Sequence, residues 1–260
     1  PLLPNRAIDP WCGFNPWETW FFTVLTASLS YLGYIAVRLL GPARGLVVSG
    51  LAGALISSTA VTVAFARTAS SGGNARALSG AAALAAMVSV LRVWVVMLIL
   101  APHALEVAGP PALAAAAAFS AIAFLLLSSV PKTNADPERQ ARNPFELTAL
   151  LVFAAAFATV STASAALTAR FGSASILASS AVSGAFDVDV AVLSALRLAG
   201  TEVSLSLIGQ AVLVALTANA CGRLLLAAVA GPARYWLPLA AATAVAASAG
   251  ALVFIGLNGI

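Results

Sequence analysis

Apolar stretches of about 20 residues or more, the length that a helix needs to cross a bilayer, fill most of this chain. Short polar breaks separate them. Only 8% of the residues are charged, against about 25% in an ordinary soluble domain, and a single soluble core cannot bury so much apolar surface. We therefore expect an all-α, polytopic transmembrane helix bundle.

The lengths of the apolar stretches predict about eight transmembrane spans. Glycine- and proline-rich breaks mark most of their ends. The most polar stretch, PKTNADPERQAR, is a loop at 131–142 that separates a first transmembrane repeat at 15–130 from a second at 143–260. Residues 1–14 are predicted to form a linker or an interfacial segment. The predicted spans cover 18–40, 45–66, 77–101, 110–130, 146–169, 174–197, 203–229 and 236–258.

The two halves of the chain resemble each other, which predicts duplication of a four-helix unit. Asn-Pro-Trp-Glu before the first span corresponds to Asn-Pro-Phe-Glu before the fifth. Aligning 46–67 with 176–197 places Arg67 over Arg197, and a further shift of one residue places Arg92 over Arg223. Four spans per half predict a pseudo-twofold axis along the membrane normal, whereas three or five would predict inverted repeats.

The distribution of basic residues predicts the orientation in the membrane. Under the eight-span topology the amino-terminal side carries Arg6, Arg67, Arg76, Lys132, Arg139, Arg142 and Arg197, and the other side Arg38, Arg44, Arg170 and Arg234. The positive-inside rule then places the amino terminus in the cytoplasm of a bacterial inner membrane. The net charge of +4 is spread along the loops, which suits an anionic lipid leaflet and does not form the basic cluster that nucleic acid requires.

Asp187 and Asp189 are the strongest candidate functional residues, because a carboxylate in the middle of a span costs about 3 kcal/mol and needs a cavity or a partner. Acids at i and i+2 lie about 200° apart on a regular helix. Local unwinding at Ser183-Gly184 would let both acids and freed carbonyls form a cation or proton site. In a regular helix, one acid would instead pair with an arginine.

Hydroxyl groups occupy the equivalent position in the first half. Ser57, Ser58 and Thr59 align with the Asp-Val-Asp run, and are candidate substrate-binding residues facing those acids. Close packing between helices is the alternative role for hydroxyls in a membrane.

Three other polar residues lie within predicted spans. Arg92 is about nine residues from its span end, so we expect an internal partner, with an intramembrane Asp as the candidate. Arg223 lies nearer a span end, and we expect it to snorkel to the interface. Asn219 can line the same interior or bond between helices. We therefore add Arg92 and Asn219 to the candidate substrate-binding residues.

Glu18 and Glu146 have a structural explanation. In the sequence Asn-Pro-x-Glu, asparagine is a preferred N-cap, proline suits the first helical position, and glutamate completes a capping box.

We do not expect an enzyme. His103 is the single histidine, and Cys12 and Cys221 lie far apart, so neither a catalytic triad nor a Cys/His metal site can form. A phosphate-binding loop with its lysine is also missing from the sequence. We expect no catalytic residue and no cofactor; a cation at Asp187 and Asp189 is the candidate bound ion.

Several motifs resemble a family of bacterial membrane domains. They are the runs LPNRAIDPWCGFNPWETW, SYLGYIAVRLLGPARGLVVSGLAGALISSTAVT and NPFEL, followed by SGAFDVDVAVLSALRLAG. The resemblance is to an uncharacterised domain that follows MgtC/SapB-type segments in longer polypeptides. It implies an upstream MgtC-type segment, consistent with the start at Pro1, and a connection with magnesium homeostasis.

Two functions remain open. The first is a transporter or channel-like protein for a cation, divalent or proton-coupled, that uses the mid-membrane acids. The second is a non-transporting, MgtC-like regulatory module that binds another membrane protein. Alanine-rich spans such as ALAAAAAFSAIAF also suit close packing, either against other spans of this chain or against a second copy.

Overall fold

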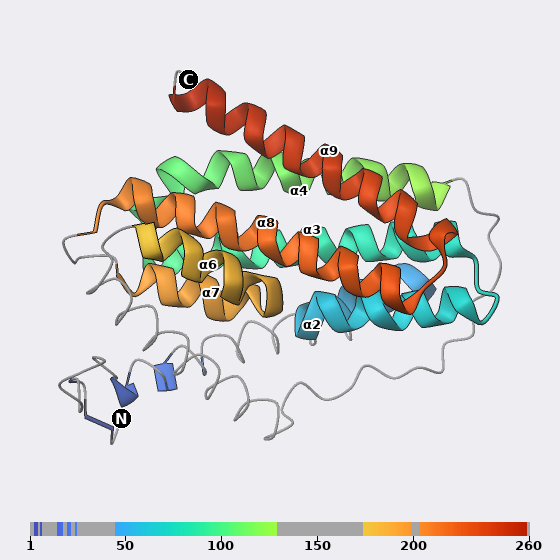
Figure 1. Ribbon diagram of the computed structural model, residues 1–260, viewed down its shortest axis with the longest axis horizontal. Helices are drawn as coiled ribbons and strands as arrows, with labels where there is room; N and C mark the ends of the chain where they lie inside the picture. The colour runs from blue at the N-terminus through green and yellow to red at the C-terminus, as the bar shows by residue number, and fades with distance from the viewer. Residues whose placement is uncertain are drawn as a thin grey trace. The chain divides into compact units, whose positions relative to one another are not determined.

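The computed structural model describes residues 45–128, 174–198 and 203–258, with isolated residues between 3 and 24. Every regular element in these parts is a helix (Figure 1), so the all-helical prediction is confirmed there. The predicted span 146–169 lies outside the described residues, and 18–40 nearly so. The helices are α2 (Gly45–Ser70), α3 (Ala75–Leu100), the 3-10 helix η1 (Pro102–Ala104), α4 (Leu105–Ser128), α6 (Ala174–Phe186), α7 (Val188–Leu196), α8 (Leu205–Ala230) and α9 (Ala233–Asn258).

Four helical segments are long and apolar enough to cross a membrane. They are Ala75–Leu100, Pro102–Ser128, Leu205–Ala230 and Ala233–Leu257, with mean hydropathies of 2.4, 2.0, 1.9 and 2.0. Large apolar side chains on their surfaces are strongly exposed, among them Phe124 at 72% and Val229 at 80%. Such exposure is unfavourable in water and expected in lipid. The protein is therefore membrane-like, and these segments agree with four of the predicted spans.

The chain forms two compact units. The first comprises Pro1–Leu29, Val96–Ala108 and Phe145–Asn219, and includes α6, α7 and the start of α8. The second comprises Ser30–Val95, Gly109–Pro144 and Ala220–Ile260, and includes α2, α9 and the end of α8.

In the first unit, α6 and α7 form a helical hairpin rather than the continuous span predicted over 174–197. In one regular helix, Ile176 and Ala195 would be separated by about 28 Å. Instead they belong to one buried cluster with Ala211 of α8, and the two helices lie side by side (Figure 1). The chain reverses at Asp187, whose φ and ψ of −148° and 114° are those of an extended strand. The prediction of a single crossing here is wrong.

In the second unit, α2 is interrupted in the same way at Ser57. This residue has φ of −160° and ψ of 108° between two helical arms. When a single non-helical residue joins two helices, its φ and ψ set the angle between them, because the peptide planes are rigid. These angles nearly equal those of Asp187. We infer that the two arms of α2 also fold back into a hairpin.

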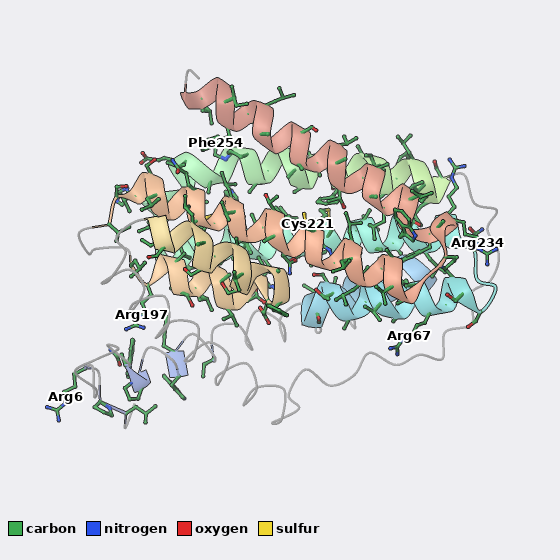
Figure 2. The ribbon with its side chains drawn as sticks, in the orientation of Figure 1. Arg6, Arg67, Arg197, Cys221, Arg234 and Phe254 are labelled. Atoms are coloured by element: carbon green, nitrogen blue, oxygen red, sulfur yellow. The ribbon has the colours of Figure 1, made fainter. Side chains whose placement is uncertain are left out.

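Two hydrogen bonds show which helix ends meet at one end of the second unit. The end of α2 meets the end of α8, because the Ser70 hydroxyl bonds the Ala230 carbonyl at 3.3 Å. The start of α9 lies at the same end, since Arg234 Nη2 donates to the Ala69 carbonyl at 3.0 Å. Figure 2 shows Arg234 and Arg67, which lies in the last turn of α2, toward the right of the view.

Helices α3, α4 and α9 pack in alternating directions within this unit. A Cβ on Gly80, near the start of α3, would lie 2.9 Å from Leu127 near the end of α4. A Cβ on Gly250, near the end of α9, would lie 3.1 Å from the carbonyl of Pro111 near the start of α4. Helix α4 therefore runs antiparallel to both α3 and α9.

One predicted helix start is partly described. Asn15 Oδ1 accepts the Trp17 N–H at 3.0 Å, and the helix begins at Pro16, so asparagine caps it as predicted. Glu18 and Glu146 lie outside the described residues.

Candidate functional site

The tip of the α6–α7 hairpin carries the two predicted acids. Asp187 is the N-cap of α7, and its Oδ1 accepts the N–H groups of Asp189 at 2.9 Å and Val190 at 3.2 Å. These bonds satisfy helix donors that have no partner in the preceding turn. Asp189 lies in the first turn of α7, where the helix dipole favours negative charge.

The unwinding predicted at Ser183-Gly184 occurs three residues later. Both residues remain in α6: the Ser183 hydroxyl donates to the Ser179 carbonyl at 2.6 Å. Gly184 allows close packing instead, because a Cβ there would lie 2.6 Å from the carbonyl oxygen of Ala215 on α8. The break falls at Asp187 since its carboxylate can replace the lost backbone partners.

The hairpin tip offers an oxygen-rich environment. The last carbonyls of α6 lie at a helix end, where intrahelical donors run out, directly before Asp187. Among the described residues, no three or more His, Cys, Asp and Glu side chains lie close enough together to hold a metal ion. A cation bound here would therefore be held by the two carboxylates together with backbone carbonyls or water.

The tip of the α2 hairpin carries the predicted hydroxyls. Ser57 Oγ accepts the Ala60 N–H at 3.2 Å, so Ser57 caps the second arm of α2. Ser58 is buried, and its Oγ accepts a hydrogen bond of 3.3 Å from Arg223 Nη1. Thr59 is partly buried beside them. Ser58 is thus bonded to a side chain of α8, while substrate binding by these three hydroxyls stays a prediction.

The two intramembrane arginines of the second unit contact opposite sides of the α2 break. Arg92 Nη1 donates to the Leu55 carbonyl, in the first arm, at 3.0 Å. Arg223 contacts Ser58, in the second arm, and is only 4% exposed. It does not snorkel to the interface, so that prediction is wrong: neighbouring helices cover it.

Sequence reasoning missed Tyr235, which is fully buried beside this cluster. Its hydroxyl donates to the Thr62 carbonyl at 2.8 Å, and its own carbonyl accepts from the Ser79 hydroxyl at 2.6 Å. The only available signal was a phenol within an apolar stretch, since buried Tyr hydroxyls find partners.

The predicted site residues fall into different units. Asp187, Asp189 and Asn219 belong to the first, whereas Ser57–Thr59 and Arg92 belong to the second. Asn219 is 5% exposed on α8. The structure joins Asp187 to Asp189 at one tip, and Ser58 to Arg223 at the other.

Comparison with known proteins gives a family and no function. No curated protein and no solved structure is detectably similar to this chain. Residues 24–231, which include both hairpins, match a protein family described as Domain of unknown function (DUF4010). Because the match covers most of the chain, the protein belongs to this family.

Proposed function

We propose that this protein is a secondary transporter, or a channel-like protein, that moves a cation or proton across the bacterial inner membrane. One observation carries the proposal. Two apolar segments each break at a single polar residue, and the internal alignment pairs these residues, Ser57 with Asp187. Non-helical backbone at membrane depth is tolerated only where it is buried in protein or lines a cavity. In transporters, discontinuous helices of this kind bind ions and substrates.

The short arms support a re-entrant topology. At 1.5 Å per residue, the 13 residues of α6 and the 9 of α7 span about 20 and 14 Å, less than the roughly 30 Å of hydrocarbon. Each half then has one hairpin and three crossings. The crossings are α3, α4 and the predicted 18–40 in the first half, and α8, α9 and the predicted 146–169 in the second.

Three crossings per half imply inverted repeats in place of the parallel repeats that eight spans imply. The helix ends agree with this topology. The α2 hairpin opens where α3 begins, and Ile176 and Ala195 place the opening of the α6–α7 hairpin near the start of α8. Near the start of α8, Gly209 packs closely against Ala104 and Val107. Directly after the end of α8, Gly231 packs closely against Ala66.

This topology also changes the proposed orientation. Arg67, Arg76 and Arg234 all lie at the end of the second unit where α2 ends and α3 and α9 begin. Three further basic residues follow α4 closely in the sequence, at 132, 139 and 142. The positive-inside rule assigns this end to the cytoplasm. With one crossing at 18–40, the amino terminus is then periplasmic, the reverse of the eight-span prediction.

The acids give the proposed site its chemistry. Asp187 is held in a fixed orientation by two backbone N–H groups. Asp189 follows two residues later in the chain. Carboxylate, carbonyl and water oxygens are the ligands of hard cations. Carboxylates at membrane depth also act in proton relays. Catalysis has no part in this proposal.

The test is charge movement in liposomes on a solid-supported membrane, with protons, Na⁺, K⁺, Mg²⁺ and Ca²⁺ offered in turn. The full chain is compared with Asp187→Asn and Asp189→Asn. Asparagine is as good an N-cap as aspartate, so Asp187→Asn removes the charge and keeps the hairpin tip. Asp187→Ser is a second neutral variant at this position: it also keeps an N-cap, but has neither the charge nor the amide.

We expect a current for at least one cation in the full chain, and its loss in all three variants with their folding intact. Silence of the well-folded full chain toward every cation would sink the proposal. That result would favour the regulatory module that binds another membrane protein. A connection with MgtC/SapB-type segments rests on the resemblance alone and stays a prediction.

A further inference from the structure

Arg92 contacts α2 at the point where the hydrogen-bond ladder of that helix is interrupted. In a regular helix the Leu55 carbonyl bonds the N–H of the residue four positions later, Thr59. That bond requires helical φ and ψ at the residues between them, and Ser57 has −160° and 108°. The Leu55 carbonyl therefore loses its donor within the helix. Arg92 Nη1 donates to the same carbonyl at 3.0 Å, so a side chain of α3 takes the place of the missing N–H.

Electrostatics favour this replacement. The Leu55 carbonyl lies in the last turn of the first α2 arm, where the helix dipole is negative and a cation is stabilising. A hydrogen bond from a charged donor is roughly twice as strong as one from a neutral donor. A carbonyl without a donor is costly at membrane depth, because no water is there to bond it. The contact with Arg92 thus stabilises the broken helix relative to a continuous one, in which the Thr59 N–H already satisfies this carbonyl.

The cap on the other side of the break is weaker than its counterpart in the second half of the chain. Ser57 Oγ accepts one N–H, from Ala60 at 3.2 Å. Asp187 Oδ1 accepts two, from Asp189 at 2.9 Å and Val190 at 3.2 Å. A single bond to a hydroxyl stabilises a helix start less than two bonds to a carboxylate. The α2 break therefore depends more on contacts from other helices than the α6–α7 break does.

We propose that Arg92 is the positioning residue of the α2 hairpin: by bonding the Leu55 carbonyl, it selects the broken conformation of α2 over a continuous helix. Arg92 then determines where the hydroxyls of Ser57, Ser58 and Thr59 lie, and it acts through the α2 backbone. The inference goes beyond the proposed transport, because these hydroxyls are positioned whether or not the protein moves an ion. It gives Arg92 a role that needs no contact with a substrate.

The distance between the two arms distinguishes the broken from the continuous conformation. Leu51 lies six residues before Ser57, and Ala64 lies seven residues after it. A hairpin places Leu51 and Ala64 level with each other, at roughly the 8–10 Å that separates packed helix axes. In a continuous helix, the same two residues are about 20 Å apart along the axis. Spin labels on Leu51→Cys and Ala64→Cys, in the full chain with its native cysteines replaced, report this distance through their dipolar coupling.

Three variants separate the hydrogen bond from the volume of the side chain. Arg92→Met keeps most of the stem and loses every donor, so we expect the strong coupling of the parent chain to be lost. Arg92→Lys keeps a charged donor and should retain the coupling. Arg234→Met is the matched control. Arg234 lies in the same unit and also donates to a carbonyl at a helix end of α2, that of Ala69, at 3.0 Å, but far from the break. This variant should keep the coupling.

Several outcomes overturn the role of Arg92. Weak coupling in the parent chain would show that α2 does not fold back. Full coupling in Arg92→Met would show that the break does not need the guanidinium. A loss in Arg92→Lys or Arg234→Met as complete as in Arg92→Met would remove the specific donor role. Should Arg92→Met fail to fold, Arg92→Gln takes its place: its amide is too short to reach the Leu55 carbonyl, so the same loss is expected, and full coupling overturns the proposal.

The measurement needs no ion, so it is separate from the test of transport. Asp187→Asn changes only the other hairpin, and it should lose the cation current while keeping the coupling between the arms of α2. A full chain that carries no current, but shows strong coupling that Arg92→Met abolishes, would overturn transport and support the role of Arg92.

Discussion

Gly184 tests whether the α6–α7 hairpin packs against α8 as closely as the structure indicates. A Cβ at this position would lie 2.6 Å from the carbonyl oxygen of Ala215 and 2.8 Å from its Cα. Ordinary contact begins at 3.4 Å. Both contacts are with the main chain, so no side-chain rotation can relieve them. In Gly184→Ala, the two helices must separate locally by several tenths of an ångström.

The expected cost follows from overpacking and helix propensity. Overpacking a well-packed contact costs about 1–3 kcal/mol, while Gly→Ala within a helix gains up to about 1 kcal/mol. We expect Gly184→Ala to lower the free energy of unfolding by about 1–2 kcal/mol. Gly256→Ala is the matched control, because nothing lies within 4 Å of its Cβ. It should be neutral or slightly stabilising.

Thermal unfolding in detergent, followed by tryptophan fluorescence, measures the difference. In a chain of about this size, each kcal/mol shifts Tm by about 2–4 °C. Ala215→Gly should not rescue Gly184→Ala, since the clashing atoms belong to the Ala215 main chain. If Gly184→Ala melts at or above the Tm of Gly256→Ala, the close approach of α6 to α8 is refuted.

Three further predictions use the same protein. Asp187→Ala should lower the free energy of unfolding by about 0.5–2 kcal/mol through loss of the N-cap, and Asp187→Asn should not; equal melting of the two would contradict the capping role. Tyr235→Phe loses the 2.8 Å bond to the Thr62 carbonyl and should cost about 0.6 kcal/mol, with about 1.7 as the upper bound. Unfolding in denaturant measures it against Tyr235→Leu, which should cost more because it also removes packed volume. In a cysteine-free background, Ser71→Cys and His103→Cys flank α3, so impermeant maleimide should label them from opposite sides of the membrane; labelling from one side would contradict a crossing by α3.

Apolar length is a local property, and it is why so much of the fold could be predicted. A segment such as Ala75–Leu100 needs lipid whatever its neighbours are, because every backbone group is bonded within the helix and the side chains are apolar. The same locality explains the caps. Ser57 and Asp187 are preferred N-cap residues, and Asn15 bonds the Trp17 N–H as its motif predicts.

Local sequence does not determine whether an apolar segment crosses the membrane or folds back. Residues 174–197 are long enough for one span, and their composition is the same in a hairpin. The reversal at Asp187 depends on contacts between residues distant in sequence, such as Ile176 with Ala195 and Ala211. In the topology that we propose, this fold-back changes the number of crossings, the relation of the repeats and the orientation.

The arginines show the same division between sequence and tertiary structure. Sequence alone identified Arg92 and Arg223 as charges within apolar segments, since that needs only their positions. The distance of Arg223 from its helix end predicted snorkelling, which assumes that lipid surrounds the helix. Tertiary structure buries it against Ser58 of α2 instead. Which helix covers a charge is decided by packing, and the free energy of a buried charge depends on everything that surrounds it.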